Sequence, residues 1–393
     1  MLEADYKLVV VGAGFFGATI ARKVASGLNL PVLVLERRDH IGGNAYSEVD
    51  SETGVEIHRY GSHLFHTSNA EVWNFLGQFT DFNSYRHRVF TRHLARIYTM
   101  PINLMTINNF FGVNLTPGQA RELVERQAAA EGISQPRNLE EKAISLIGRP
   151  LYEAFVRSYT AKQWEVDPRK LPTEIITRLP VRFNFNDFYF QDTYEGLPLI
   201  GYGELFRRML SHEGIKVITG CDFFEARPNL RAGVPIVYTG PIDRYFNYRF
   251  GELGWRTLDF EVERLNVDDF QGAAVVNYPD PDVRFTRIHE FKHLHPERRY
   301  GNKTVIMREY SRSAHRGDEP YYPIGRPEDK LRYDRYAKLA DEEENVVFGG
   351  RLGTYRYLDM HQAIGAALRA YALRILPRLT GHAVARAYGR SGS

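Results

Sequence analysis

Short, wholly apolar runs alternate with glycine-rich and charged segments near the start of this chain. Residues 8–11 (LVVV) predict a strand that is covered on both faces, as the strands of a parallel sheet are. Residues 15–24 predict an apolar helix, and residues 31–35 predict a second buried strand. A strand, a helix and a strand in this order predict a right-handed βαβ unit.

Residues 100–165 have a helical pattern instead. Thr116 before Pro117 is typical of a helix start. Asn138, with Glu141 three residues later, predicts another start, and apolar residues follow it at near-helical spacing. We therefore expect a helical insertion after the first α/β segment.

Elsewhere the pattern has the period of strands. Alternating apolar and polar residues predict antiparallel strands, and short buried runs predict further parallel strands. The alternating segments are residues 85–98, 181–190 and much of 244–310, and the buried runs are residues 216–219, 236–239 and 345–348. A further helix is expected from residue 360 onward.

Composition narrows the class of protein. Hydrophobic residues make up 43% and charged residues 25% of the 393 residues, which is typical of a globular fold. The net charge of +3 is too small to indicate nucleic-acid binding. The apolar run at residues 8–21 is shorter than the roughly 20 residues that cross a bilayer, so we expect no membrane insertion. No signal-peptide pattern is visible and the lone Cys221 cannot form an intramolecular disulfide, so we expect a cytoplasmic protein.

The turn after the first strand carries the glycines Gly12, Gly14 and Gly17. In a dinucleotide-binding βαβ unit the first glycine makes the turn, the second lets the backbone approach a pyrophosphate, and the third lets the helix pack on the strand. The diphosphate then lies at the helix N-terminus. Glu36 ends the second strand, where it can accept a hydrogen bond from a ribose hydroxyl. The spacing predicts a bound dinucleotide.

Two further segments favour FAD over NAD. Residues 37–44 (RRDHIGGN) resemble the second signature of flavoproteins with two dinucleotide domains, whose paired glycines bring another loop against the FAD diphosphate. Gly349, Gly350 and Arg351 come shortly before a helix that starts near Asp359. A helix N-terminus aimed at the flavin would stabilise an anionic reduced flavin.

The expected fold class is therefore α/β: a Rossmann-type FAD-binding domain with a helical insertion and an antiparallel β-sheet substrate domain. We expect the FAD-binding domain over residues 1–80, completed by 200–243 and 340–385. The helical domain, with part of the substrate site and a mobile loop, is expected over 100–175, and the sheet domain over 244–339 together with 81–99 and 176–199.

Longer motifs indicate a family. In chain order they are residues 60–67 (YGSHLFHT), 159–164 (YTAKQW), 178–184 (RLPVRFN), 286–288 (TRI), 320–323 (PYYP) and 350–360 (GRLGTYRYLDM). Together they closely resemble bacterial UDP-galactopyranose mutases, and the resemblance covers nearly the whole chain. Long motifs in one shared order argue against chance similarity.

The resemblance implies UDP-galactose as the substrate and names the residues that bind it. Arginine matches phosphate oxygens with two donors at once, and Arg178, on a mobile loop, and Arg287 take this role. With His63 they are the expected catalytic residues. The expected substrate-binding set is Phe155, Tyr159, Trp164, Arg178, Tyr189, Arg256, Asn277, Arg287, Tyr322, Arg351 and Tyr357. The expected cofactor-binding set is Gly12, Gly14, Phe16, Gly17, Glu36, Arg37, Gly43, Asn44, His63, Leu64, Phe223, Arg351, Tyr357, Leu358, Asp359 and Met360.

The implied reaction interconverts UDP-galactopyranose and UDP-galactofuranose with no net redox change, and it serves the biosynthesis of galactofuranose for polysaccharides. Reduced flavin N5 attacks the anomeric carbon, so the nucleophile belongs to the cofactor. We also expect an external reductant such as NAD(P)H, and a homo-oligomer that binds no nucleic acid.

Two other functions stay open on the sequence. A conventional flavin oxidoreductase of the amine-oxidase type would share the FAD domain, but it leaves Arg178 and Arg287 unexplained. A sensor of UDP-sugar or flavin would bind its ligand without turnover. Arg287 also has a plainer alternative, which is to pair with Glu290 or Glu309 across a strand.

A few positions depart from the family pattern. Ser62 stands where proline is expected, Phe16 replaces a small residue, and His87 replaces asparagine near the substrate. The spacing of His63 and His66 could suggest a metal, but no third ligand accompanies them in the sequence. We therefore expect no metal site.

Overall fold

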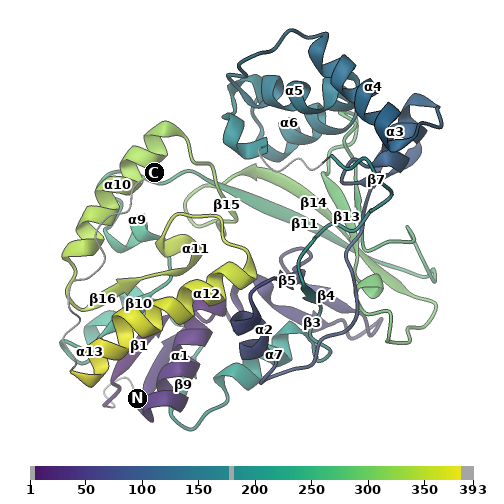
Figure 1. Ribbon diagram of the computed structural model, residues 1–393. Helices are drawn as coiled ribbons and strands as arrows, with labels where there is room; N and C mark the ends of the chain where they lie inside the picture. Colours follow the sequence, from purple (N-terminus) through teal and green to yellow (C-terminus); the bar gives the residue numbers. More distant parts are fainter. Residues whose placement is uncertain (1–4, 177–180, 382–393) are drawn as a thin grey trace.

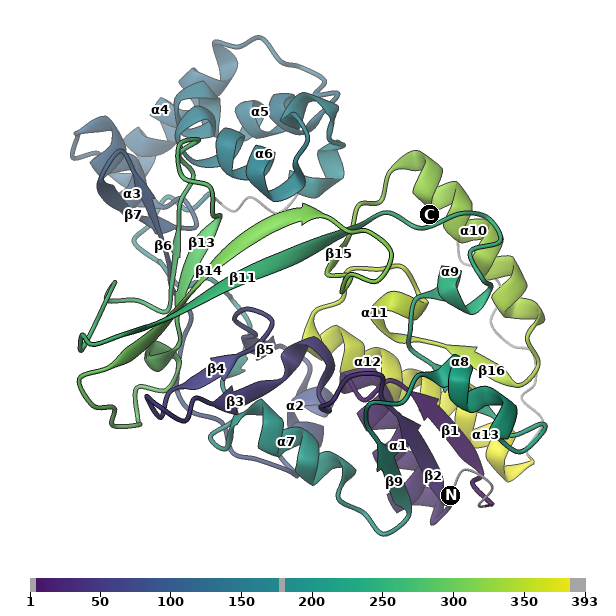
Figure 2. The ribbon, with the colours of Figure 1, turned by 180° about the vertical axis from the view of Figure 1, so that it is seen from behind.

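The structure is a computed structural model that describes residues 5–176 and 181–381. Figures 1 and 2 show an α/β part, a separate cluster of helices at the opposite end, and a long twisted sheet between them. Parallel and antiparallel sheets occur together with helices, which confirms the expected α/β class.

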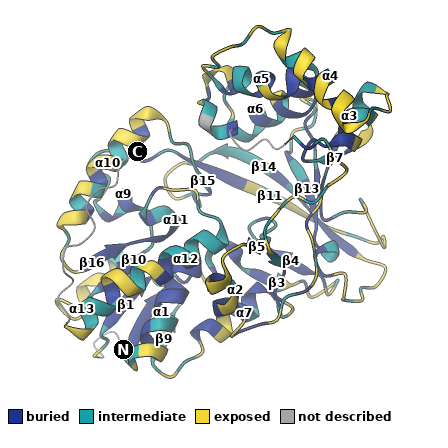
Figure 3. Cartoon of the chain, viewed as in Figure 1, coloured by how far each residue is buried: buried dark blue, intermediate teal, exposed yellow. Residues whose placement is uncertain are grey.

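A five-stranded parallel sheet is the centre of the α/β part, in the order β16-β10-β1-β2-β9. Each buried run in the sequence forms one of its strands. Their bounds are β1 Leu8–Val11, β2 Val32–Leu35, β9 Ile215–Ile218, β10 Ile236–Tyr238 and β16 Val346–Phe348. Figure 3 shows β1, β10 and β16 as buried, whereas β9 at the edge of the sheet is partly exposed and α4 and α10 have exposed outward faces.

The helices of the described chain are short to medium in length. Within residues 5–176 and 181–381, none combines the length and apolar character needed to cross a membrane. Their bounds are α1 Phe15–Leu28, α2 Ala70–Leu76, α3 Leu104–Phe111, α4 Pro117–Ala129, α5 Leu139–Tyr152, α6 Ser158–Trp164, α7 Gly201–Leu210, α8 Phe223–Ala226, α9 Ile242–Tyr245, α10 Pro327–Glu342, α11 Gly350–Gly353, α12 Met360–Ala370 and α13 Leu376–Thr380.

The two faces of the parallel sheet receive alternate residues of each strand, because side chains along a strand point to opposite sides. In β1, Leu8 and Val10 belong to a core with α1, α7 and α12. Val9 and Val11 belong to a second core with α8 and α9. All four residues are at most 9% exposed. The run LVVV is continuous in the sequence because both faces of the sheet are covered at β1.

A seven-stranded sheet forms the middle of the molecule, in the order β15-β11-β14-β13-β12-β6-β7. Adjacent strands in this sheet are antiparallel, except that β12 runs parallel to β6. The bounds are β6 Val89–His93, β7 Arg96–Met100, β11 Trp255–Leu265, β12 Val275–Asn277, β13 Arg287–Glu290, β14 Thr304–Ser313 and β15 Tyr322–Pro323. Two small ribbons pair β3 Ser47–Val49 with β4 Glu56–His58, and β5 Phe65–Thr67 with β8 Tyr194–Gly196.

Helices α3 to α6 form the separate cluster, and the predicted helix starts are correct. Pro117 is the first residue of α4. The Asn138 side chain accepts a hydrogen bond from the Glu141 amide at 2.9 Å and so caps α5. A π-helical turn, Glu153–Arg157, joins α5 to α6. The chain therefore does insert a helical unit at this point.

The expectation of a strand over residues 181–190 was wrong. The segment forms a single isolated bridge, through Phe188. Its backbone finds side-chain partners instead: Asn184 Oδ1 accepts from the Asn186 amide at 3.0 Å, and Asn186 Oδ1 accepts from the Phe188 amide at 3.1 Å. Arg182 donates to the carbonyls of Asn186 and Phe188. These local hydrogen bonds satisfy the segment as turns, so it has no need of a strand partner.

Candidate active site

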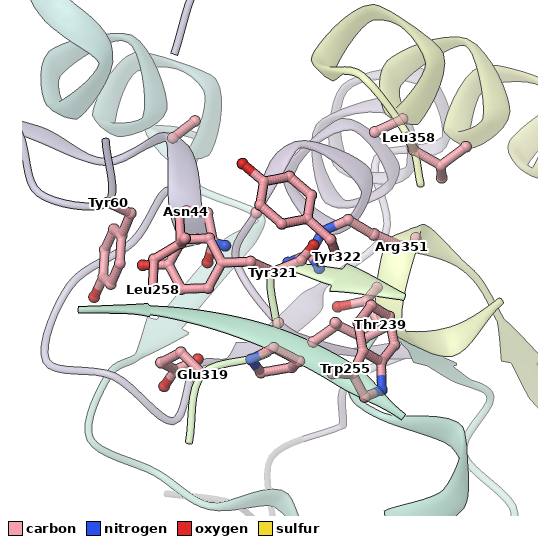
Figure 4. A pocket seen from close by; sticks show the side chains of 18 of the residues that line it. Asn44, Tyr60, Thr239, Trp255, Leu258, Glu319, Tyr321, Tyr322, Arg351 and Leu358 are labelled. Atoms are coloured by element: carbon pink, nitrogen blue, oxygen red, sulfur yellow. Dashed lines mark hydrogen bonds between the residues drawn. The ribbon is translucent and has the colours of Figure 1, made fainter. Parts of the chain in front are cut away.

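A cavity of about 990 Å³ lies at the carboxyl ends of β1, β2 and β10 and extends to the seven-stranded sheet. Val11, Leu35 and Tyr238 line one part of it, and Asn277 and Arg287 line another. Figure 4 shows side chains from distant parts of the sequence around it. Ligands of open α/β sheets bind in such a crevice.

The glycine turn after β1 is shaped by close approaches. Gly12 has a φ of +100°, and a Cβ there would lie 2.1 Å from Thr239 Oγ1. A Cβ at Gly17 would lie 2.0 Å from the Gly12 carbonyl oxygen, so α1 packs directly on the turn. The Glu36 carboxylate accepts a hydrogen bond from the Ala13 amide at 2.8 Å and holds the turn from the end of β2.

A second loop closes over this turn. The Gly42 amide donates to the Ala13 carbonyl at 2.9 Å. A Cβ at Gly43, whose φ is +58°, would lie 3.2 Å from Gly14 Cα. The backbones of the two glycine motifs therefore face each other without an intervening side chain, at the N-terminus of α1. We call the part of the cavity wall that these two motifs form the glycine slot; it suits a diphosphate, which backbone amides and a helix N-terminus bind.

Arg38 adds a cation beside the glycine slot that the sequence interpretation overlooked. Its Nη2 donates to Asn44 Oδ1 at 2.7 Å and to Glu319 Oε2 at 2.6 Å, and its guanidinium lies 4.3 Å from the centre of the Tyr60 ring. Nη1 is buried and has no hydrogen-bond partner within the described residues. An unpaired buried donor is costly, so Nη1 is suited to an anion bound in the cavity. Arg37, which was predicted, is 46% exposed and pairs with Glu319 from outside.

The segment before α12 forms the next wall. The Phe16 ring packs on Gly349, where a Cβ would lie 2.2 Å from Phe16 Cζ. Arg351 donates to the Tyr321 carbonyl at 2.5 Å. Burial, with the nearby Arg38, lowers the pKa of Arg351 to about 10, so it stays charged near neutral pH. The N-terminal residue of α12 lines the cavity, where a helix dipole stabilises negative charge.

His63 lines the cavity as a neutral imidazole. Its Nδ1 lies 2.8 Å from the Gly61 carbonyl, which can only accept, so Nδ1 carries the proton. Burial lowers the pKa of His63 to about 4, and Nε2 therefore keeps its lone pair near neutral pH. Ser62, in place of proline, forms a hydrogen bond with His289 Nδ1 at 2.8 Å. A side-chain contact thus ties this loop to β13.

Across the cavity, Arg287 of β13 lies between a carboxylate and a phenol. Its Nε is 3.2 Å from Glu309 Oε1, and its Nη2 donates to the Tyr159 hydroxyl. Burial disfavours the charge on both Arg287 and Glu309, but their attraction outweighs burial. The pKa of Arg287 is raised and the pKa of Glu309 is lowered to about 2. Arg287 thus pairs with Glu309 on the neighbouring strand, which was the alternative to substrate binding, and it also lines the cavity.

Tyrosines gather at this end of the cavity. Tyr322 and Tyr357 stack with ring centroids 5.9 Å apart. Tyr189 meets His87 edge-on, with centroids 5.6 Å apart. His87 Nδ1 is 2.9 Å from the Tyr85 hydroxyl, and burial lowers the pKa of His87 to about 3. Arg287, paired with Glu309 on one side, thus lies near several neutral hydrogen-bonding groups, and this setting suits a phosphorylated, hydroxyl-rich ligand.

The cavity gathers most of the predicted site residues. All members of the predicted cofactor-binding set line it. From the predicted substrate-binding set it is lined by Tyr159, Tyr189, Asn277, Arg287, Tyr322, Arg351 and Tyr357. Arg178 lies outside the described residues.

Phe155, Trp164 and Arg256 do not line the cavity. Phe155 packs in the helical cluster, with its ring centroid 5.0 Å from that of Tyr98. Trp164 packs against the same cluster. Arg256 is 1% exposed and donates to the Gln163 carbonyl near the end of α6. In this structure these side chains hold α6 and its neighbours together.

His66 has neighbours that its place in the sequence does not reveal. Asp359 and His361 offer ligand atoms that lie, with one of His66, within 4.8 Å of one another. The expectation of no metal rested on the lack of a third ligand for the pair His63 and His66, and the group found here contains His66 but not His63. His66 Nδ1 already pairs with Asp192 at 2.7 Å, and the Asp359 side chain caps α12. His66 and Asp359 thus have protein partners, whereas His361 Nδ1 is buried without a hydrogen-bond partner among the described residues. The expectation of no metal stays a prediction.

Comparison with known families gives two matches. Residues 154–357 match the family described as UDP-galactopyranose mutase. Residues 10–79 match the NAD(P)-binding Rossmann-like domain, in agreement with the glycine turn and β1-α1-β2.

Individual relatives span nearly the whole chain. A protein of Klebsiella pneumoniae named probable UDP-galactopyranose mutase is 42% identical over 92% of this chain and 93% of its own. A dTDP-fucopyranose mutase of Escherichia coli is 39% identical over 94% of this chain and 98% of its own. A crystal structure of reduced UDP-galactopyranose mutase has the same fold, with a TM-score of 0.72 and 16% identity over 97% of this chain and 96% of that one.

Proposed function

This chain belongs to the UDP-galactopyranose mutase family, as its motifs predicted, and from that premise we propose that it interconverts UDP-galactopyranose and UDP-galactofuranose with bound, reduced FAD. The observation that carries the proposal is the continuity of the cavity. It joins the glycine slot, which fits a dinucleotide, to the cation and tyrosines around Arg287, which fit a nucleotide sugar.

At the dinucleotide end the chain supplies binding and electrostatics. Backbone amides of the glycine slot and the unpaired Nη1 of Arg38 hold the diphosphate of FAD. The N-terminus of α12 favours negative charge on the reduced cofactor. When bound and reduced, FAD supplies a nucleophilic nitrogen, N5, for the anomeric carbon of the sugar. His63 offers Nε2 to the same cavity as an acceptor.

At the sugar end Arg287 binds the substrate diphosphate. Negative charge on the diphosphate grows as the anomeric bond breaks, so a fixed cation stabilises the transition state more than the ground state. Glu309 keeps Arg287 charged and oriented, and the Tyr159 hydroxyl accepts from its Nη2. Hydroxyls of Tyr322 and Tyr357 bind oxygens of the detached nucleotide, so that the diphosphate is still in place when the ring has changed.

A second substrate is favoured by one observation. The Escherichia coli relative, at 39% identity, is named for dTDP-fucopyranose, which carries the same diphosphate on a different base and sugar. Arg287 and the tyrosines bind what the two substrates share. UDP-galactose is the proposed substrate because the family match and the relative at 42% identity carry that name.

The test uses purified protein reduced with dithionite, with UDP-galactofuranose as substrate and chromatographic separation of products. We expect conversion to UDP-galactopyranose after reduction and almost none with oxidised flavin. Equal turnover in both states would refute the role of N5. Replacing dithionite by NADPH asks whether a nicotinamide serves as the external reductant.

The same preparation separates the competing functions. A higher kcat/KM for dTDP-fucofuranose would reassign the substrate. Bleaching of the oxidised flavin by UDP-galactose alone would indicate an oxidoreductase. Tight binding of UDP-galactose without turnover of the reduced protein would indicate a sensor.

A further inference from the structure

Lys162, on the last turn of α6, has an ammonium group surrounded by backbone carbonyls. They belong to one loop between β12 and β13, and the acceptors are Tyr278, Asp280 at 3.0 Å, Val283 at 2.9 Å and Phe285 at 3.1 Å. Burial lowers the pKa of Lys162 to about 8, against the attraction of Asp280 and Asp282. A partly buried cation with several acceptors is held in one place. Its displacement would leave both the ammonium group and the carbonyls without hydrogen-bond partners.

The same end of α6 has a second attachment. The Gln163 carbonyl accepts from Arg256 Nε at 3.1 Å and from Ser311 Oγ at 2.7 Å. Arg256, at 1% exposure, also donates to the Glu165 carboxylate at 2.9 Å. Glu165 has a φ of +50° and ends the helix. The C-terminus of α6 is therefore fixed to β11 and β14, and Figure 2 shows α6 beside these strands.

The two attachments bear on the substrate end of the cavity. Tyr159 lies three residues before Lys162 on α6, so the two side chains share a face of the helix. The loop that Lys162 grips leads directly into β13, whose first residue is Arg287. Tyr159 and Arg287 meet in a hydrogen bond. Lys162 thus attaches α6, which carries Tyr159, to the loop that directly precedes Arg287.

We propose that Lys162 is a positioning residue: by holding α6 on the 278–285 loop, with Arg256 as the second anchor, it sets the distance between Tyr159 and Arg287 across the cavity. The inference rests on the proposed function for its catalytic consequence. A misplacement of about 1 Å in such a pair can cost on the order of 100-fold in rate.

The test compares Lys162→Met, which keeps the length of the side chain and removes its charge, with Lys338→Met, an exposed lysine on α10. We expect Lys162→Met to keep its flavin, to bind UDP more weakly, and to lose about 100-fold in kcat. Lys162→Arg should be intermediate, because it keeps the charge but not the compact shape of an ammonium. Lys338→Met should match the wild type. A folded Lys162→Met variant with normal UDP affinity and turnover would overturn the proposal.

A double-mutant cycle distinguishes positioning from a general loss of stability. If Lys162 acts through Tyr159, Lys162→Met combined with Tyr159→Phe weakens UDP binding no further, within about twofold, than the stronger single change. Losses that simply multiply would contradict the proposal. If Lys162→Met does not fold, Lys162→Arg takes its place in the cycle under the same criterion. A wild type that fails to convert UDP-galactofuranose would refute the proposed function, whereas the cycle on UDP affinity would still decide the role of Lys162.

Discussion

Arg287 of β13 donates a hydrogen bond from Nη2 to the hydroxyl of Tyr159 on α6, while its Nε faces Glu309 Oε1 at 3.2 Å. One guanidinium is therefore shared between a helix and a strand of the sheet. Because Glu309 is only 2% exposed, Arg287 both neutralises a buried carboxylate and presents charge to the cavity. Its replacement should affect stability and catalysis together.

Replacing Arg287 by alanine should lower turnover of the reduced enzyme roughly thirtyfold to a thousandfold, or about 2–4 kcal/mol of transition-state stabilisation. It should also reduce the free energy of unfolding by about 3 kcal/mol, because Glu309 loses its cationic partner in a buried site. Turnover, melting temperature and flavin content are measured on one preparation. Arg287→Lys should recover only part of the rate, since an ammonium lacks the two-pronged geometry.

Adding Glu309→Gln to Arg287→Ala separates the two effects. The double variant should regain much of the lost melting temperature, because no buried carboxylate is left unpaired. Its turnover should stay low, because the cavity still lacks the cation. Recovery of turnover together with stability would show that Arg287 only braces the sheet.

Gly43→Ala should empty the protein of flavin without unfolding it. The new Cβ would lie 3.2 Å from Gly14 Cα and push apart the two backbones that form the glycine slot, where a diphosphate is expected. The matched control is Gly54→Ala, which has a similar positive φ of +70° but no atom within 4 Å of the new Cβ. Both variants should carry a backbone penalty of about 1 kcal/mol. Flavin absorbance per protein should fall in Gly43→Ala alone, and equal flavin content in the two variants would argue against the slot.

The free energy of unfolding should fall as the pH is lowered from 6.5 towards 4. Burial lowers the pKa of His63 to about 4 and the pKa of His87 to about 3, from an ordinary 6.5. Below pH 6.5 these histidines bind protons in the unfolded chain but stay neutral in the folded chain. Each of them then lowers the free energy of unfolding by up to about 1.4 kcal/mol per pH unit. Glu309, with a pKa of about 2, adds to this loss only below its ordinary 4.5.

Melting temperature against pH, for the wild type and His87→Asn, measures this effect. The variant should show a shallower decline between pH 6.5 and 4.5, a window above the range in which Glu309 titrates. Other described histidines with lowered pKa values keep the decline from vanishing: His40, His58, His289, His295 and His361. His293, whose pKa is raised, opposes them. Identical slopes in the two proteins would mean that His87 is not held neutral.

UDP should slow amide exchange in residues 165–176, the segment after α6. Arg169, Lys170 and Pro172 are exposed there, while Leu171 is anchored in the helical cluster. Connecting segments of this kind open at low cost in free energy, and bound ligand suppresses such opening. Exchange is followed by mass spectrometry with α10 as an internal reference. Unchanged exchange at saturating UDP would remove this segment from the substrate site.

The parallel sheet and the cofactor end of the cavity could be predicted because local sequence determines them. The run at β1 is apolar on both faces, and the conformations of Gly12 and Gly43 leave no choice of residue. Residues 181–190 show the opposite case. Apolar and polar residues do alternate there, but the side chains of Asn184 and Asn186 accept hydrogen bonds from nearby backbone amides. A pattern of apolar positions does not show whether the backbone bonds to such side chains or to a neighbouring strand.

At the substrate end, residue type alone did not decide location. Arg256 and Arg287 are both arginines on strands of one sheet, yet the first is buried under α6 and the second lines the cavity. Strand register and the placing of α6 make that difference, and both depend on long-range packing. Arg38 had one usable signal, since it repeats Arg37 in RRDHIGGN, but only the structure shows which of the two turns inward.

The contact between Phe16 and Gly349 links two places far apart in the chain. Because the ring occupies the space of a side chain at 349, neither position can change freely while the other stays as it is. A homologue with a small residue at 16 has room to vary at 349, and one with phenylalanine does not. A glycine turn exchanged between relatives should therefore keep its packing only if residue 349 is exchanged with it. Positions 16 and 349 should accordingly covary among relatives.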